Sequence, residues 1–211
     1  MSALLLSADA PGALDEAVAR LRADELVVFP TDTVYGVGAH GLREEAVAKL
    51  FTAKFRPLHK AIPLLLADAA DVAEVAQDVS DVARDLMARY WPGALTLVVA
   101  ARPGLPPSLT AGEPTVAVRM PDCEVTRALA RLLGAPLAAT SANLSGASPA
   151  VTAQEAVAAL GDRVALVLDG GPSPIGQAST VLDVTVYPPR VLRAGHLVDD
   201  AYLASLLASP S

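Results

Sequence analysis

Residues 27–38 read VVFPTDTVYGVG and join a short apolar run to a polar segment that contains two glycines. The run at residues 25–29 is rich in β-branched side chains and ends at Pro30, so it predicts a strand. Apolar residues recur at helical spacing on both sides of this segment, over residues 14–23 and 42–51. The segment therefore predicts a helix, a strand, a polar loop and a second helix, which is how an α/β fold begins.

The rest of the chain continues the same alternation. Further strands are predicted at residues 62–66, 95–100, 115–119, 136–139, 164–168, 180–184 and 190–192. Further helices are predicted at residues 69–77, 80–90, 125–133, 153–160 and about 199–207, with a surface loop at residues 102–114. Because some connections are too short for a parallel crossover, we expect an α/β fold with a mixed sheet. No composition shift marks a boundary within the 211 residues, so we expect a single domain.

The composition limits the class of protein. Hydrophobic residues make up 53% of the chain, but the longest apolar runs, at residues 61–67 and 94–101, are far shorter than the roughly 20 residues of a membrane span. The N-terminal sequence MSALLLSADAPG has no basic region and too short an apolar run for a secretory signal, so we expect a cytoplasmic protein with no membrane segment. One cysteine, Cys123, and three histidines outside metal-binding spacings do not indicate a dedicated metal site.

The charges are unevenly distributed along the chain. The net charge of −7 argues against a protein whose whole surface binds nucleic acid. Yet all three lysines, Lys49, Lys54 and Lys60, lie in one window that also contains Arg56. A local cationic patch in an acidic protein is typical of a site for a small polyanion, and a solvated helix end would give the same pattern.

The loop after the first predicted strand carries three hydroxyl groups. Thr31, Thr33 and Tyr35 occupy alternating positions, so in an extended chain their side chains point the same way. Polar loops that follow strands gather along one edge of an α/β sheet, where ligands usually bind. Taken alone, the same pattern would also fit an ordinary turn.

Two further loops have the side chains that phosphate groups need. KFRP places Lys54 and Arg56 two residues apart, which joins a point charge to a planar fork that can bind two oxygens at once. ATSAN supplies Thr140, Ser141 and Asn143, which are small donors that let a substrate approach the backbone closely. The pattern suits a triphosphate, and either segment taken alone would also fit an ordinary polar loop.

The order of the motifs resembles that of a known family. PTDTVYGVG, KFRP, WPGALT, VAVRMP, ATSANLSG, a GG loop followed by STVLD, and VLRAG occur in the order that characterises YrdC-like threonylcarbamoyl-AMP synthases. The resemblance runs from about residue 26 to residue 195. It implies a twisted open mixed sheet with flanking helices and a concave basic cleft. Because the chain ends soon after Gly195, the resemblance is to the short, single-domain form.

The resemblance also implies roles for individual residues. In the family, the lysine and arginine of KxR and the serine and asparagine of SxN form a tetrad, which falls here on Lys54, Arg56, Ser141 and Asn143. The implied threonine contacts are Thr33, Tyr35, Arg119, Ala139 and Ser179, and the implied ATP contacts are Arg56, Lys60, Thr115, Ser141 and Arg193.

Three of these positions deserve comment. Phe55 lies in the middle of KxR, where the family commonly has a small residue such as glycine, so either the local backbone or the lid-like loop is expected to differ. Arg119 is suited to a buried amino-acid carboxylate, which needs a fork-shaped cation. Arg193 would bring a second guanidinium to the phosphates, although either arginine could instead make a structural ion pair.

The implied activity is that of an L-threonylcarbamoyladenylate synthase, which is a nucleotidyltransferase. The amine of threonine captures carbon dioxide or bicarbonate, and the new carboxylate attacks the α-phosphorus of ATP and expels pyrophosphate. Such a reaction needs no protein nucleophile, so catalysis consists chiefly of positioning and of stabilising charge on phosphoryl oxygens. Magnesium would be bound by the triphosphate. The implied partners are downstream proteins that transfer the threonylcarbamoyl group to tRNA.

Other functions remain open on the sequence. Residues 36–41, GVGAHG, match GxGxxG, and Asp68 follows the next predicted strand, so a Rossmann-type dinucleotide-binding domain is one alternative. The match is poor, because PTDTVY separates the strand from the glycines, whereas the fingerprint needs the glycines directly at the end of the strand. A non-enzymatic RNA-binding module is a second, with only weak RNA binding expected of an acidic chain. A third keeps the fold and changes the acceptor, as in hydrogenase-maturation carbamoyltransferases, which are usually larger multidomain proteins.

Overall fold

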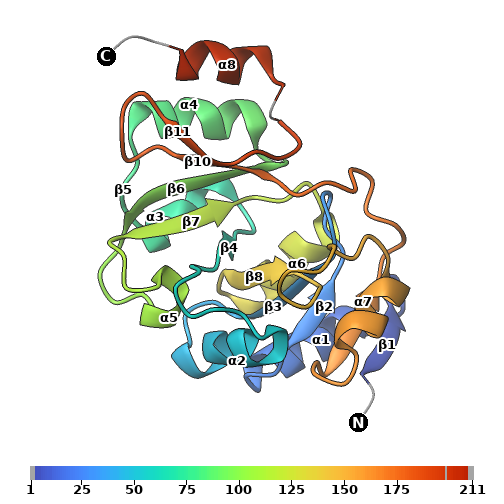
Figure 1. The fold of residues 1–211 in the computed structure, drawn as a ribbon. Coiled ribbons are helices and arrows are strands. Elements are labelled where there is room, and N and C mark those ends of the chain that lie inside the picture. Colours follow the sequence, from blue (N-terminus) through green and yellow to red (C-terminus); the bar gives the residue numbers. More distant parts are fainter. Residues whose placement is uncertain (1–2, 198, 209–211) are drawn as a thin grey trace.

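The fold is built around one β-sheet that runs through the molecule (Figure 1). The computed structural model describes residues 3–197 and 199–208. The strands are β1 (Leu4–Ser7), β2 (Val27–Phe29), β3 (Gly36–His40), β4 (Leu64–Leu65), β5 (Ala76–Asp78), β6 (Leu95–Ala101), β7 (Thr115–Arg119), β8 (Leu137–Ser141), β9 (Leu166–Asp169), β10 (Thr180–Asp183) and β11 (Arg190–Arg193). The helices are α1 (Ala13–Arg22), α2 (Glu44–Lys54), a 3₁₀ turn (Ala69–Asp71), α3 (Val72–Val75), α4 (Asp81–Tyr90), α5 (Pro107–Thr110), α6 (Glu124–Leu133), α7 (Ala153–Leu160) and α8 (Ala201–Leu207).

The sheet is mixed. Its strand order is β1-β9-β2-β3-β8-β4-β7-β6-β10-β11, and β5 pairs with β6 beside this path. The pairs β1·β9, β2·β9, β4·β7 and β6·β10 are parallel, and the remaining pairs are antiparallel. The predicted α/β class with an open mixed sheet and flanking helices is therefore confirmed.

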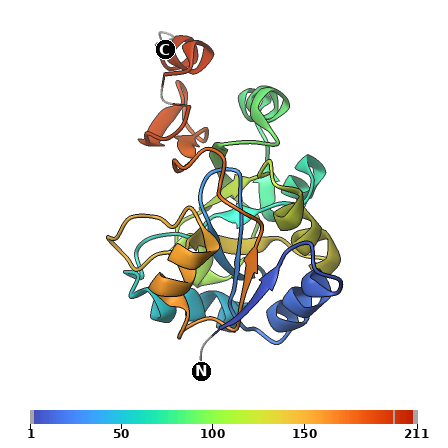
Figure 2. The same cartoon turned by 90° about the vertical axis from the view of Figure 1, so that its right-hand side faces the viewer.

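The sheet separates two apolar cores. In β2, Val28 packs in the core that also contains side chains of α2, α3, α4 and α7, whereas Val27 and Phe29 pack in the core that contains side chains of α1 and α6. This alternation follows from the two-residue repeat of a strand. Figure 2 shows α4 and α8 at the end of the molecule farthest from the N-terminus.

One face of the sheet is only partly covered by helices. Among the described residues, the core of α1 and α6 includes no side chain from β6, β7 or β10. In β7, Val116 and Val118 are buried in the other core, whereas Thr115 and Ala117 face the opposite way and are half-buried. An uncovered stretch of sheet therefore adjoins the layer of α1 and α6, and Arg119 ends β7 at this border.

The glycines of GVGAHG form part of a strand rather than a phosphate-binding turn. Strand β3 is antiparallel to both β2 and β8. A Cβ at Gly36 would lie 2.9 Å from Phe29 Cε2, and one at Gly38 would lie 2.7 Å from Phe29 Cε1, so glycine allows the Phe29 ring to pack on this strand. The Rossmann alternative is wrong, because these glycines do not open a helix after a parallel strand.

Three other parts of the fold differ from the sequence prediction. The apolar run near the N-terminus, for which no strand was predicted, forms strand β1 at Leu4–Ser7 and pairs with β9. The helix predicted at residues 69–77 is a 3₁₀ turn and the single turn α3, because the chain then extends into β5 and pairs with the edge of β6. The predicted surface loop at residues 102–114 contains the short helix α5.

The end of α2 has an unusual backbone conformation. Phe55 follows Lys54 with a φ of 52°, which is the left-handed conformation that commonly ends a helix and favours glycine. Its ring is 67% exposed, and the Arg163 guanidinium lies 4.4 Å from the ring centroid. A glycine at this position would adopt the left-handed backbone without steric cost, whereas Phe55 adopts it at a conformational cost.

The left-handed backbone gives a first prediction. Phe55→Gly and Phe55→Ala both remove the ring contact with Arg163, so they differ mainly in backbone preference. We expect the glycine variant to have a free energy of unfolding about 1 kcal/mol higher than the alanine variant, measured by urea denaturation. Equal stability of the two variants would show that the left-handed conformation is not kept in solution.

Candidate functional site

Loops from distant parts of the chain meet at the carboxyl ends of β2, β8 and β9. The Tyr35 amide donates to the Ala150 carbonyl at 2.9 Å, and the Ala142 amide donates to the Tyr35 carbonyl at 2.8 Å. The Ile175 amide donates to the Asp32 carbonyl at 3.0 Å. The polar loops thus gather along one edge of the sheet, as the sequence predicted.

A tight turn after β2 fixes the first of these loops. Thr31 Oγ1 donates to the Val34 carbonyl at 2.6 Å and accepts the amides of Thr33 and Val34, each at 3.2 Å. Before the turn, Thr126 Oγ1 donates to the Pro30 carbonyl at 2.5 Å and so attaches the loop to α6. The turn places the next two side chains over the end of the sheet.

Tyr35 does not share a face with the two threonines. Its side chain is fully buried, and its hydroxyl donates to the Gly171 carbonyl at 2.7 Å and accepts the Gly170 amide at 3.2 Å. Burial raises the pKa of Tyr35 to about 12, and Asp169 adds to the shift. The expectation of three hydroxyls pointing the same way is wrong for Tyr35, because the chain turns at Thr31 instead of staying extended.

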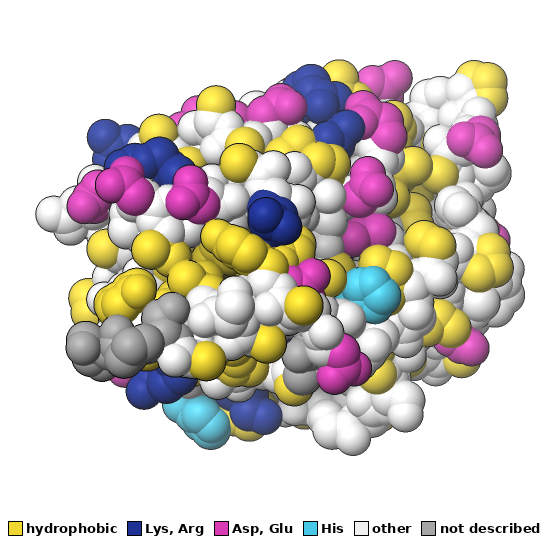
Figure 3. All heavy atoms as spheres, turned by 90° about the horizontal axis from the view of Figure 1, so that it is seen from above, with side chains coloured by type: hydrophobic (Ala, Val, Ile, Leu, Met, Phe, Trp, Pro, Cys, Tyr) yellow, Lys and Arg dark blue, Asp and Glu magenta, His cyan; other side chains and the backbone are white. Residues whose placement is uncertain are grey.

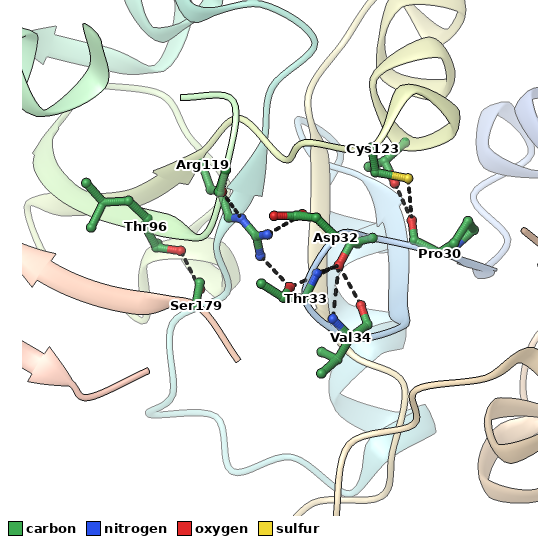
Figure 4. A network of polar contacts seen from close by, with 12 residues as sticks. Pro30, Asp32, Thr33, Val34, Thr96, Arg119, Cys123 and Ser179 are labelled. Atoms are coloured by element: carbon green, nitrogen blue, oxygen red, sulfur yellow. Dashed lines mark hydrogen bonds and ion pairs between the residues drawn. The ribbon is translucent and has the colours of Figure 1, made fainter. Parts of the chain in front are cut away.

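Arg119 and Asp32 form a buried ion pair at the end of β7. Arg119 Nη2 lies 2.5 Å from Asp32 Oδ1, and the two side chains are 7% and 5% exposed. Arg119 Nη1 donates to Thr33 Oγ1 at 2.8 Å (Figure 4). Arg119 Nε donates to the Gly93 carbonyl at 2.8 Å. Burial lowers the pKa of Arg119 and raises that of Asp32, while each partner opposes the shift of the other. Within the described residues, these contacts use three of the five guanidinium N–H groups.

Lys54 joins the KFRP and ATSAN loops. It is the last residue of α2, is 2% exposed, and its ammonium donates to the backbone carbonyls of Ser141 and Asn143. Burial lowers the pKa of Lys54 to about 8, and the neighbouring Arg56 adds to the shift. Among the described residues, the two carbonyls occupy two of the three N–H groups of the ammonium. The third N–H group can donate to a further acceptor.

The side chain of Asn143 is an organiser of its loop rather than a donor to a ligand. Its Nδ2 donates to the carbonyls of Leu144 and Ala147 at 2.7 and 2.8 Å, which uses both amide hydrogens. In the described part of the chain, its buried Oδ1 has no hydrogen-bond partner. The prediction of a donor at this position is therefore wrong, and what Asn143 offers is an acceptor.

Two more arginines approach the same region. Arg56 folds over its own loop, where Nε donates to the Lys60 carbonyl at 3.1 Å and Nη2 donates to the Ala61 carbonyl at 2.7 Å. Burial lowers the pKa of Arg56, and the positive charge of Arg193 adds to the shift. Arg193 also lowers the pKa of Arg119, so the three guanidinium groups lie within electrostatic reach of one another.

Arg193 is attached to Ser179 on the open sheet face. Arg193 Nε donates to the Ser179 carbonyl at 3.0 Å, and Nη2 donates to Ser179 Oγ at 2.8 Å. Ser179 Oγ lies 2.8 Å from Thr96 Oγ1. Leu97 pairs with Val118, so Thr96 is the cross-strand neighbour of Arg119. Hydrogen bonds therefore link β6 and β11 through Ser179, the residue before β10, and Thr96 lies next to Arg119 in the sheet.

Two predicted site residues lie apart from this centre. Thr115 begins β7 and Arg119 ends it, so their Cα atoms are about 13 Å apart on the same face of the strand. Ala139 lies within β8, is 5% exposed, and uses its amide to donate to the Pro63 carbonyl at 3.0 Å. Thr115 thus marks the far end of the open face, and Ala139 lies inside the sheet.

Sequence reasoning did not single out two residues of this network, Asp32 and Thr96. Asp32 lies inside PTDT, and a carboxylate between two threonines directly after a buried strand is a signal that was present in the sequence. Thr96 lies in a strand that is otherwise apolar, and a polar side chain at a buried position was the signal there.

The face of the molecule seen from above carries charges of both signs (Figure 3). On the face shown in Figure 3, basic and acidic side chains are interspersed and apolar side chains lie between them. Among the described residues, no group of three or more His, Cys, Asp and Glu side chains is placed to hold a metal ion. No helix in residues 3–197 or 199–208 combines the length and hydropathy needed to cross a membrane.

Comparison with known proteins agrees with this geometry. The model of the Sua5/YciO/YrdC family, described as "Telomere recombination", matches residues 19–195. The threonylcarbamoyl-AMP synthase of Bacillus subtilis strain 168 is 42% identical over 186 residues, which are 88% of this chain and 54% of that protein. A putative threonylcarbamoyl-AMP synthase of Mycobacterium tuberculosis is 44% identical over 179 residues, which are 85% of this chain and 82% of that protein. The structure of P. abyssi Sua5 complexed with L-threonine superposes with a TM-score of 0.85 at 39% identity, over 86% of this chain and 54% of that one.

The relatives differ in length. This chain spans about half of the B. subtilis protein and of the P. abyssi structure, and most of the M. tuberculosis protein. The family match nevertheless covers most of the present chain and includes every loop of the site described above. The chain therefore belongs to the Sua5/YciO/YrdC family.

Proposed function

We propose that this chain is an L-threonylcarbamoyladenylate synthase, a nucleotidyltransferase that forms threonylcarbamoyl-AMP and pyrophosphate from L-threonine, bicarbonate or carbon dioxide, and ATP. Downstream proteins would then transfer the threonylcarbamoyl group to tRNA. Two relatives that are more than 40% identical bear the name of this activity, one of them as putative. We further propose that residues 1–211 act as one domain in the cytoplasm, where these substrates are available.

The observation that carries the proposal is the contact of Lys54 with the carbonyls of Ser141 and Asn143. It brings the cations of KFRP and the polar ATSAN loop to the same place. Four positive charges, those of Lys54, Arg56, Arg119 and Arg193, influence one another there. Like charges repel, so an arrangement of this kind is stabilised when a polyanion such as a triphosphate binds.

The ATP side of the site is built from long cationic side chains. Arg56 and Arg193 each keep N–H groups beyond those that contact the protein, and a planar guanidinium can bind two phosphate oxygens at once. Lys60 lies exposed on the same loop as Arg56. We assign the nucleotide to Arg56, Lys60, Thr115, Ser141 and Arg193, with Thr115 at the far end of the open face.

The threonine side of the site is built around Arg119. Two of its N–H groups remain for the amino-acid carboxylate. Thr33 and Ser179 provide hydroxyl groups on either side, and Ala139 supplies part of the sheet floor. Tyr35 supports the loop from within, since its hydroxyl is bonded to the backbone at Gly170 and Gly171.

Catalysis would follow from position and charge. The carboxylate formed on the threonine nitrogen attacks the α-phosphorus, and pyrophosphate leaves with the electron pair of the broken P–O bond. Charge grows on the phosphoryl oxygens in this step, and the remaining N–H of Lys54 and the free N–H groups of Arg56 can stabilise it. Mg²⁺ would be bound to the triphosphate, where the acceptor Oδ1 of Asn143 can face a cation or an N–H group but not a phosphate oxygen.

The first test removes the cations of KFRP. We expect Lys54→Ala and Arg56→Ala each to lower threonine-dependent pyrophosphate release by about 100-fold or more, because each removes a charge that stabilises the transition state. Pyrophosphate is measured with ATP, magnesium, bicarbonate and threonine. Lys49→Ala is the matched control, since Lys49 lies on the same helix but is exposed, and it should keep full activity. Circular dichroism checks that each variant is folded, and full activity in both site variants would refute the proposal.

The lowered pKa of Lys54 gives a pH prediction. Lys54 carries its charge below its pKa and loses it as the pH rises, so kcat/KM for ATP should fall above about pH 8. In kcat, which reports the ATP complex, the same fall should occur at higher pH, because the triphosphate stabilises the ammonium. A kcat/KM that stays level to pH 10 would show that Lys54 does not contact the nucleotide as a cation.

A further inference from the structure

Asp32 has an acceptor that the fold does not use. Its side chain is 5% exposed, and its Oδ1 is paired with Arg119. Among the described residues, its Oδ2 is buried and has no hydrogen-bond partner. A buried carboxylate oxygen without a partner costs free energy, so the arrangement calls for a group that is supplied from outside the fold.

The position of Asp32 indicates what that group is. Asp32 and Thr33 both contact the guanidinium of Arg119, so Asp32 lies within the proposed threonine site. A free amino acid carries a carboxylate and an ammonium group on the same carbon atom. The ion pair presents the two opposite charges side by side, with a guanidinium that keeps two N–H groups and a carboxylate that keeps one oxygen. The pair is therefore a complement to both charged groups of an amino acid.

We infer that Asp32 binds the amino group of the threonine substrate through Oδ2, while Arg119 binds its carboxylate. The inference rests on the proposed function. It gives the site a means to select α-amino acids over hydroxy acids of the same shape, and it holds the reacting nitrogen in a fixed place before carboxylation. Asp32 is in this sense a substrate-binding residue in addition to a partner of Arg119.

The local geometry allows this contact. The Asp32 carboxylate is paired with Arg119 through Oδ1, so a contact of an ammonium group with Oδ2 leaves that ion pair in place. Burial is the largest cause of the raised pKa of Asp32, and the carboxylate of Asp122 adds to it. Arg119 and the backbone amides of Asp32 and Asp122 oppose that shift. A bound ammonium would act in the same direction as Arg119 and would stabilise the ionised carboxylate.

The competing explanation is that Asp32 only holds Arg119 in place. In that case removal of the carboxylate would weaken every ligand that Arg119 binds by the same factor. If Asp32 binds the ammonium, its removal would weaken only ligands that have one. The two explanations are separated by 3-hydroxybutyrate, which is threonine without the amino group.

The experiment measures Kd for L-threonine and for 3-hydroxybutyrate by isothermal titration calorimetry. We expect the wild-type chain to prefer threonine by about 10- to 100-fold, the range of one charge-assisted hydrogen bond to a buried partner. In Asp32→Asn this preference should fall to about twofold or less. Asp32→Ser, which removes the carboxylate in a smaller side chain, is a second variant in case the first does not fold. Circular dichroism establishes which variant is folded.

The control is Asp122→Asn. The side chain of Asp122 is exposed, and its charge acts on Asp32. This variant removes that negative charge, keeps the backbone amide of residue 122 and removes no proposed contact with the ligand. It should keep the wild-type preference. An Asp32 variant that weakens both ligands equally and keeps the preference would overturn the inference and leave the proposed function intact. A wild-type chain that neither binds threonine nor releases pyrophosphate with it would overturn both.

Discussion

The bond between the Lys54 ammonium and the carbonyls of Ser141 and Asn143 is the contact on which the site depends. A buried ammonium loses its hydration, and two carbonyl oxygens compensate only because the end of α2 lies directly against the end of β8. The same contact fixes the position of the Arg56 backbone, since Arg56 lies two residues after Lys54. The cationic loop is therefore positioned by one lysine, whose ammonium binds the carbonyl of Ser141, 87 residues later in the sequence.

The second constraint is the incomplete cover of the sheet. Helices α1 and α6 cover one part of a sheet face. The part of the same face formed by β6, β7 and β10 is not covered by these two helices. At this border the Arg119 side chain is 7% exposed and pairs with Asp32 of the turn after β2. A border of this kind combines low dielectric on one side with access for a ligand on the other, which strengthens ionic contacts made there.

Much of the fold could be predicted because most strands and helices have a clear apolar repeat. Strand β3 could not, because its two glycines read as a loop, and their purpose depends on the Phe29 ring. The site loops were predicted from residue types, but the directions of their side chains were not. Tyr35 turns to Gly171 and Asn143 to Ala147, and such choices depend on which carbonyl lies nearby in the folded chain. Sequence patterns give the inventory of groups, and tertiary contacts decide which of them remain available to a ligand.

The attachment of Arg193 to Ser179 has a consequence for synthesis on the ribosome. Both residues belong to the last strands of the sheet, β10 and β11 and the segment before them, whereas Lys54, Arg56 and Arg119 are made much earlier. A nascent chain can bury most of its two apolar cores before β10 emerges. The charge of Arg193 joins those of Lys54, Arg56 and Arg119 only when residue 193 has left the exit tunnel. A growing polypeptide would therefore form most of its apolar core well before it has the full set of anion-binding groups.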